Sequence, residues 1–311
     1  MRVGVVDIGT NSTRMLVADV DDGGVDEVDR RTRVTRLGEG LDAGGELGDE
    51  PMRRVLDTLD RYRAAIAEHR CDATTGVLTS AVRDAANGAR FADEVQRRYG
   101  FDARTIDGET EARLTFLGAT AGSPQRRDRP ALVIDVGGGS TELVVGAGGA
   151  VSFHASTPAG VVRQTERHLH SDPPAPPQLQ SLVEEVRATI EEAVPAGVRR
   201  SAMQAIAVAG TATSAAAIDL DLEPYDPARV EGHVLALGEL ELLLARLAAV
   251  PLAERRRVTG LHPDRAPTIV AGVAILVEAL RLFGLEEVTV SEHDILWGAA
   301  LDRAARDPAA R

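Results

Sequence analysis

Two carboxylates frame a glycine turn near the middle of the chain. Asp135 closes one apolar run and Glu142 opens the next. The turn between them contains Gly137, Gly138, Gly139, Ser140 and Thr141. Glycines lack a Cβ, so their N–H groups can approach an anion closely, and the two hydroxyls are further donors. The carboxylates would repel a bare phosphate but can hold a divalent cation that bridges to it. This stretch therefore predicts a phosphate-binding hairpin.

The same pattern occurs near the N-terminus. Residues 7–17 align with residues 135–145 without a gap, and Asp, Gly, Ser, Thr and the final Val recur. In the first copy Arg14 stands where Glu142 stands in the second, so the first loop suits phosphate and the second suits a metal. For either copy alone, a tight glycine turn between two core strands is an alternative. Two copies in register predict related halves that face each other across a phosphate cleft.

Composition describes a globular protein with local basic sites. The 311 residues suffice for two domains, and 44% of them are hydrophobic. The single cysteine cannot form an internal disulfide, and no signal peptide is evident, so we expect a cytoplasmic protein without a membrane partner. The net charge of −13 argues against nucleic acid as a partner. All 35 basic residues are arginines, so every basic side chain on a phosphate must be a guanidinium.

Alternating strand and helix patterns must position these loops. An amphipathic helix is predicted over residues 52–69, followed by a strand over 73–78 that runs into a further helix. Strand–helix–strand crossovers indicate an α/β sheet, in which ligands bind beyond the carboxyl ends of the strands. The polar, proline-containing residues 122–130 predict a boundary between domains at 1–123 and 124–311, with the final helix able to pack back on the first domain.

Polar residues also open several predicted helices. Glu109 and Glu111 lie in a first helical turn, where acidic residues suit the helix dipole, so a structural reason alone can explain them. Ser291 is the predicted N-cap of the final helix, with Asp294 at its third position. A third helix start follows a buried strand and suits a phosphate or a nucleoside. Its polar residues are Gly210, Thr211 and Thr213.

The order of these motifs resembles that in the exopolyphosphatase and guanosine pentaphosphate phosphatase family, part of the sugar kinase, heat-shock chaperone and actin superfamily. The resemblance spans nearly the whole chain, so it is far more specific than one glycine loop. It implies two actin-like, ribonuclease-H-like α/β domains with an interdomain phosphate cleft. The matching segments are residues 7–12, 35–41, 79–85, 108–113, 135–142, 165–169, 210–213, 225–227, 260–263 and 291–296.

The resemblance also implies a reaction and the residues that perform it. The terminal phosphate of inorganic polyphosphate, or the 5′-γ-phosphate of guanosine pentaphosphate, would pass to water. Glu111 becomes the general base. Asp135 and Glu142 match positions that hold Mg²⁺, with Mn²⁺ as a substitute, and Asp7 would act through a water. The implied phosphate-binding residues are Asn11, Ser12, Thr13, Arg14, Arg83, Gly137, Gly138, Gly139, Ser140 and Thr141. Gly210, Thr211 and Thr213 would accept a nucleoside or a distal phosphate.

Two other classes of function stay open. A small-molecule kinase of the same superfamily would need ADP or ATP, and a non-catalytic sensor of polyphosphate or guanosine tetraphosphate would not need Glu111. Longer family members carry an extra helical part, so we expect short to medium polyphosphate here, or a channel built by a homodimer. Aromatic residues make up only 3% of the chain and none lies beside the loops, which favours polyphosphate over guanosine pentaphosphate.

Overall fold

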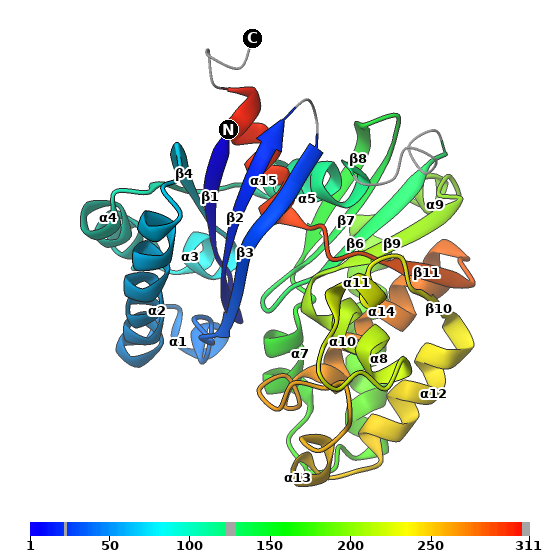
Figure 1. Cartoon of the computed structure of the whole chain (residues 1–311). Coiled ribbons are helices and arrows are strands. Elements are labelled where there is room, and N and C mark those ends of the chain that lie inside the picture. Colours follow the sequence, from blue (N-terminus) through cyan, green and yellow to red (C-terminus); the bar gives the residue numbers. More distant parts are fainter. Residues whose placement is uncertain (22–23, 122–128, 307–311) are drawn as a thin grey trace. The chain divides into compact units, whose positions relative to one another are not determined.

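The structure, a computed structural model, describes residues 1–21, 24–121 and 129–306 (Figure 1). The chain divides into two compact units. Unit 1 comprises Met1–Gly122 and His293–Arg311, and unit 2 comprises Ser123–Glu292. The boundary predicted at residue 123 lies in residues 122–128, outside the described residues. The chain returns to unit 1 at His293 because the apolar side chains of the last helix join the core of that unit.

A mixed sheet forms the centre of unit 1 (Figure 1). Its strands are β1 (Arg2–Ile8), β2 (Ser12–Asp21), β3 (Gly24–Val34), β4 (Ala73–Leu78) and β5 (Asp102–Thr105). They lie in the order β3-β2-β1-β4-β5, with β1, β2 and β3 antiparallel and β4 parallel to β1. The central strand β1 is almost wholly buried, as expected for an apolar strand that is covered on both faces.

Helices cover both faces of this sheet. They are α1 (Leu41–Gly44), α2 (Asp49–Glu68), α3 (Ser80–Asp84), α4 (Gly88–Tyr99), α5 (Gly108–Ala121) and α15 (Ile295–Ala305). Because side chains alternate along a strand, Val6 and Ile8 pack with α2 and α4 on one face, and Val3 and Val5 pack with α5 and α15 on the other. Asp7 follows the same alternation, so it belongs to the face that α5 and α15 cover.

Two glycines bring α5 and α15 into backbone contact. A Cβ on Gly118 would lie 2.0 Å from the carbonyl oxygen of Asp294, and a Cβ on Gly298 would lie 1.8 Å from that of Leu114. No larger residue fits either position without moving a helix. The helix that carries Glu111 is therefore held against the start of the helix that follows Asp294.

Unit 2 repeats this topology. Its strands are β6 (Ala131–Val136), β7 (Thr141–Ala147), β8 (Ala150–Thr157), β9 (Gln204–Val208), β10 (Val234–Ala236) and β11 (Glu287–Val290). The order is β10-β11-β9-β6-β7-β8, with β6, β7 and β8 antiparallel and β9 parallel to β6. Strands β6 to β9 thus correspond to β1 to β4. The predicted fold class, two actin-like α/β domains, is confirmed.

The helices of unit 2 pack around the apolar helix α14. They are α7 (Val161–His168), α8 (Pro176–Ala193), α9 (Ala196–Arg199), α10 (Ala209–Asp219), α11 (Pro227–Val230), α12 (Leu237–Ala248), α13 (Leu252–Arg255) and α14 (Ile269–Phe283). Nearly every residue of α14 is buried, as expected for a helix that is apolar on all sides. Within the described ranges, no helix combines the length and apolarity needed to span a bilayer.

The final helix begins later than predicted. The N–H of Ser291 donates to the carbonyl of Ala207 at 2.9 Å, which continues the pairing of β11 with β9 beyond the end of the strand. Ser291 therefore belongs to the sheet edge, and its prediction as N-cap was wrong. Asp294 is the N-cap, because its carboxylate accepts a hydrogen bond of 3.0 Å from the N–H of Leu296.

Candidate active site

Each unit forms a tight turn at its predicted phosphate loop. In unit 1 the turn joins β1 to β2, and the N–H of Gly9 donates to the carbonyl of Ser12 at 3.0 Å. In unit 2 it joins β6 to β7, and Gly137 donates to Ser140 at 2.9 Å. The same hydrogen bond therefore closes both copies of the sequence repeat. We name the turns loop 1 (residues 9–12) and loop 2 (residues 137–140).

The closed turns leave backbone donors unused. Among the described residues, nothing accepts a hydrogen bond from the N–H groups of Thr10 and Asn11 in loop 1, or of Gly138 and Gly139 in loop 2. Adjacent free N–H groups at a turn form a concavity that binds anions. Both loops can therefore take phosphate oxygens through the main chain.

The threonine that follows each loop uses its hydroxyl in a hydrogen bond within the protein. The hydroxyl of Thr13 shares a hydrogen bond of 2.9 Å with that of Thr35, and the hydroxyl of Thr141 donates to the carbonyl of Ala159 at 2.6 Å. Both threonines are fully buried. Their predicted phosphate contacts would have to come from the main chain, because each side chain already has an internal partner.

Three other polar side chains of the loops are available, whereas the hydroxyl of Thr10 is bonded to that of Ser80 at 2.8 Å. Within the part of the chain that the structure describes, the side chains of Asn11, Ser12 and Ser140 have no hydrogen-bond partner. Ser140 is nearly buried. Besides its free N–H groups, loop 1 offers the side chains of Asn11 and Ser12 to an anion, and loop 2 offers that of Ser140.

The start of α7 forms hydrogen bonds to loop 2 and supports it. The N–H of Val161 donates to the carbonyl of Gly137 at 2.9 Å, and that of Val162 donates to Gly138 at 2.8 Å. A Cβ on Gly160 would lie only 2.2 Å from the carbonyl carbon of Gly139. Only glycine allows this approach, so Gly160 helps to fix the conformation of loop 2, which sequence reasoning did not anticipate.

Arg14 of unit 1 lies between two carboxylates. It faces Asp7 across the β1–β2 pair, and its Nε and Nη2 donate to Oδ2 of Asp7 at 2.8 and 2.6 Å. Its Nη1 donates to Asp294. Arg14 was predicted to bind phosphate, and in this structure the guanidinium is held by carboxylates. Asp294 was predicted only as a helix residue. Because it lies far from Arg14 along the chain, nothing in the sequence indicated that the two residues are in contact.

Asp7 has one oxygen to offer a ligand. The residue is 3% exposed, and its Oδ1 is buried with no hydrogen-bond partner among the described residues. Burial raises the pKa of the Asp7 carboxyl, and the neighbouring Arg14 opposes that rise. A buried carboxylate oxygen without a partner is unusual, so this atom is a candidate ligand for a cation or a water.

Glu111 lies in the first turn of α5 and is buried, whereas its neighbour Glu109 is exposed. Nη1 of Arg83 donates to Oε2 of Glu111 at 2.9 Å and to the carbonyl of Ile106 at 3.1 Å. Burial raises the pKa of Glu111, Arg83 opposes the rise, and the nearby Asp7 adds to it. A dipole-stabilising role needs no burial, so that role alone does not account for the burial of Glu111.

In unit 2 the two carboxylates of the repeat face each other. Asp135 and Glu142 are opposite partners in the β6–β7 register, and they are 8% and 2% exposed. The hydroxyl of Ser156 donates to Oε1 of Glu142 at 2.9 Å. At the equivalent position of unit 1 the opposite partners are a carboxylate and an arginine. The guanidinium of unit 1 thus corresponds to a carboxylate in unit 2, where like charges oppose each other.

These two carboxylates fit a magnesium ion that is shared with a substrate. No group of three or more His, Cys, Asp or Glu side chains arranged to hold a metal occurs in the described ranges. Mg²⁺ is usually bound by one or two carboxylates, with waters and substrate phosphates completing its shell. A cation would also relieve the repulsion between Asp135 and Glu142. The donor set therefore suits Mg²⁺ and does not suit a metal held by protein groups alone.

The start of α10 is the third predicted anion site. Thr211 and Thr213 are buried, and their hydroxyls have no hydrogen-bond partner within the described residues. A Cβ on Gly210 would lie 1.4 Å from Nη1 of Arg265, so the guanidinium lies directly on this glycine. Sequence reasoning missed Arg265, which follows Gly210 by more than fifty residues. Arg265 places a cation beside the helix start where an anion was predicted.

Comparison with known proteins agrees with this arrangement. Residues 16–302 match the model of the Ppx/GppA phosphatase family. The chain is 36% identical to Exopolyphosphatase 2 of Mycobacterium tuberculosis, over 97% of this chain and 98% of that protein. It is 30% identical to Exopolyphosphatase 1 of Mycobacterium bovis, over 93% of this chain and 84% of the relative.

Solved structures give the same result. A crystal structure of an exopolyphosphatase-like protein matches with a TM-score of 0.91 at 35% identity, covering 97% of each chain. The Ppx/GppA family member of Aquifex aeolicus matches with a TM-score of 0.83 at 29% identity, covering 99% of each chain. The resemblance stated from the motifs is confirmed: the chain belongs to the Ppx/GppA phosphatase family and is a phosphoric anhydride hydrolase.

Proposed function

We propose that the protein is an exopolyphosphatase, which releases orthophosphate from the end of an inorganic polyphosphate chain. The observation that carries the proposal is Glu111, a buried carboxyl with a raised pKa that is held by Arg83 in the unit that also contains loop 1. Relatives that are similar over nearly the full chain are named exopolyphosphatases. A sensor would have no use for a poised base, so this feature favours an enzyme.

The reaction we propose is in-line attack of water on the terminal phosphorus. Glu111 accepts the proton of the water while a new P–O bond forms, and the anhydride P–O bond to the rest of the chain breaks. The products are orthophosphate and a polyphosphate shorter by one unit. In unit 1, which also contains Glu111, the free N–H groups of loop 1 and the hydroxyl of Ser12 would stabilise the charge on the transferred group. Loop 2 and Ser140 offer the same kinds of donor in unit 2.

Mg²⁺, or Mn²⁺ in its place, is the proposed cofactor. Asp135 and Glu142 would hold the ion in unit 2. In unit 1 the unpartnered Oδ1 of Asp7 is a candidate contact for a metal-bound water. When bound, the ion supplies positive charge that neutralises the phosphate oxygens. The protein residues bind and orient the substrate whether or not they touch the ion.

Polyphosphate is the substrate that the loops suit best. Their donors are main-chain N–H groups, hydroxyls and an amide, which recognise a repeating anion. A site that recognises guanine would need an apolar or aromatic pocket for the base, and aromatic residues form only 3% of the chain. The buried hydroxyls at the start of α10 beside Arg265 are the feature that favours the alternative, guanosine pentaphosphate.

The deciding experiment compares phosphate release from polyphosphates of defined length and from guanosine pentaphosphate, with Mg²⁺ and without ADP or ATP. We expect a higher kcat/KM for at least one polyphosphate. A higher value for guanosine pentaphosphate than for every polyphosphate length would reverse the assignment. Release that depends on added ADP would instead indicate a kinase. The homodimer and the cytoplasmic location expected from the sequence stay predictions.

A further inference from the structure

We infer that Arg36, in the segment that packs on loop 1, is a substrate-binding residue that contacts an anionic oxygen of the phosphate chain. The inference rests on the proposed function and adds to it a residue that the loops and the carboxylates do not include. Both arginines predicted to hold phosphate are already engaged: Arg14 by Asp7 and Asp294, and Arg83 by Glu111. A polyanion at loop 1 therefore needs a cation from elsewhere in unit 1.

The segment after β3 folds directly onto loop 1. The N–H groups of Thr35 and Arg36 both donate to the carbonyl of Asn11, at 3.0 and 2.9 Å, and the N–H of Gly38 donates to the carbonyl of Thr10 at 2.9 Å. A Cβ on Gly38 would lie 2.2 Å from Cγ2 of Thr10. Arg36 is thus fixed beside the two residues whose N–H groups are free.

A second layer holds this segment in place. Arg54 of α2 donates to the carbonyl of Thr35 at 2.8 Å and to that of Arg36 at 3.3 Å, and it pairs with Glu39 at 2.7 Å. Leu37 is fully buried in the core beneath α2. These contacts use the backbone of Arg36 and leave its guanidinium out.

The side chain of Arg36 takes no part in the hydrogen bonds that hold this segment in place. Among the described residues it forms no hydrogen bond and no ion pair, although it is half-buried. Its φ of 49° lies in the left-handed region that glycine adopts without strain and arginine does not. Strained positions of this kind persist where the surrounding structure imposes them, and they gather at functional sites. A guanidinium without a partner, on a half-buried residue whose backbone is bonded to loop 1, is suited to bind phosphate.

The chain offers a matched control for the loss of charge. Arg33 lies on the neighbouring strand β3 opposite Thr13, is exposed and has no ion-pair partner in the described ranges. Alternation along β3 places Arg33 on the face opposite to Arg14.

Arg36→Gln and Arg33→Gln both remove one positive charge near loop 1. We expect Arg36→Gln to raise KM for tripolyphosphate by about tenfold or more, as for the loss of one charge-assisted hydrogen bond. We expect Arg33→Gln to change KM by less than about twofold, as for a screened charge.

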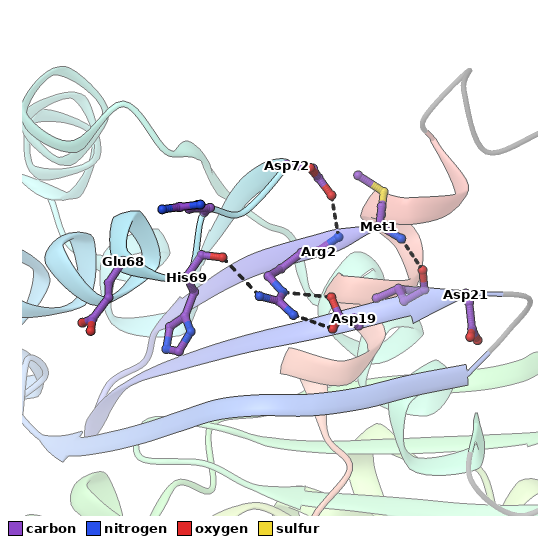
Figure 2. Close-up of a pocket in the computed structure, with 9 residues that line it drawn as sticks. Met1, Arg2, Asp19, Asp21, Glu68, His69 and Asp72 are labelled. Atoms are coloured by element: carbon purple, nitrogen blue, oxygen red, sulfur yellow. Dashed lines mark hydrogen bonds and ion pairs between the residues drawn. The ribbon is translucent and has the colours of Figure 1, made fainter.

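The chain also offers a control for backbone strain. Arg70 has a φ of 52° and lines a pocket with Met1, Arg2, Asp19 and His69 (Figure 2). This pocket lies at the start of β1, and loop 1 follows the end of that strand. Arg36→Gly and Arg70→Gly relieve the same conformation, so neither should lower the Tm. Only Arg36→Gly should raise KM.

The result can separate this inference from the proposed function. Calorimetric titration with tripolyphosphate measures binding in the parent and in each variant without requiring turnover. Weaker binding in Arg36→Gln and Arg36→Gly alone supports the inference, even if the parent releases no phosphate and the proposed function fails. Equal binding in the parent and Arg36→Gln overturns it. So does an equal loss in Arg33→Gln, because the effect would then be one of long-range charge.

Discussion

The guanidinium of Arg83 donates a hydrogen bond of 2.9 Å to the buried carboxylate of Glu111. The same nitrogen donates to the carbonyl of Ile106 at 3.1 Å, which fixes its orientation. Burial favours the protonated form of Glu111, and Arg83 favours the ionised form that a general base requires. The pair therefore sets the lowest pH at which the proposed base is available.

Replacing Arg83 should move the pH profile. In Arg83→Gln the opposing charge is lost, so the pKa of Glu111 rises further and the acidic limb of kcat/KM shifts to higher pH. Activity should fall most at low pH and least on the alkaline plateau. The profile of Arg90→Gln, which removes an exposed arginine from the same unit, should match that of the parent. An unchanged acidic limb in Arg83→Gln would mean that Glu111 does not govern it.

Replacing Glu111 should separate turnover from binding. We expect Glu111→Gln to lower kcat by roughly 10²–10⁴ fold, because the base is removed while volume and loops are kept. Binding of tripolyphosphate should persist. The matched control is Glu109→Gln, two residues earlier in the same helical turn and exposed, which should keep the parent's kcat. Near-parental turnover in Glu111→Gln would return this residue to a structural role.

The carboxylates of unit 2 should govern the metal requirement. Asp135→Asn and Glu142→Gln should each raise the Mg²⁺ concentration needed for half-maximal activity, because hard cations prefer charged oxygen ligands. Activity should recover partly at high Mg²⁺ or Mn²⁺. Glu192→Gln removes an exposed carboxylate from the same unit and should leave the titration unchanged. Identical Mg²⁺ titrations for the parent and both site variants would remove these residues from the metal site.

Asp294 should contribute to stability in two separable ways. Asp294→Ala removes the N-cap of α15 and one partner of Arg14, whose side chain is 11% exposed, so we expect a loss of roughly 3 kcal/mol or more. Asp294→Asn keeps a good capping residue and should recover about 1 kcal/mol.

Denaturant unfolding can be followed by the fluorescence of Trp297, the single tryptophan. This residue lies in α15 and stacks on His293, with the two ring centroids 3.5 Å apart. Equal losses in Asp294→Ala and Asp294→Asn would show that capping contributes nothing measurable. No loss in either variant would show that the pair with Arg14 is not stabilising.

Salt should weaken substrate binding. If arginine contacts phosphate, rising ionic strength should raise KM for polyphosphate while changing kcat less, because each contact is screened. Arg36→Gln should show a shallower dependence than the parent, since it has one contact fewer. Parallel slopes for the parent and Arg36→Gln would indicate that this guanidinium is not in contact with the substrate.

Local features of the site could be predicted from the sequence. The ungapped repeat of Asp, Gly, Ser and Thr predicted two equivalent hairpins, and the same Gly–Ser hydrogen bond closes both of them. Such turns depend on a few adjacent residues, so their signal is contained in a short stretch. The acidic start of α5 was visible for the same reason. Only the motif order singled out Glu111 from Glu109.

Long-range packing decided the rest. Thr13 and Thr141 turned inward because partners from the segments that follow β3 and β8 reach their hydroxyls, and Arg14 pairs with Asp294 from the far end of the chain. Arg36 adopts a left-handed backbone because Asn11 and Arg54 hold it there. None of these partners is near in sequence. Residue type determines which contacts a side chain can make, and the tertiary structure determines which of them it makes.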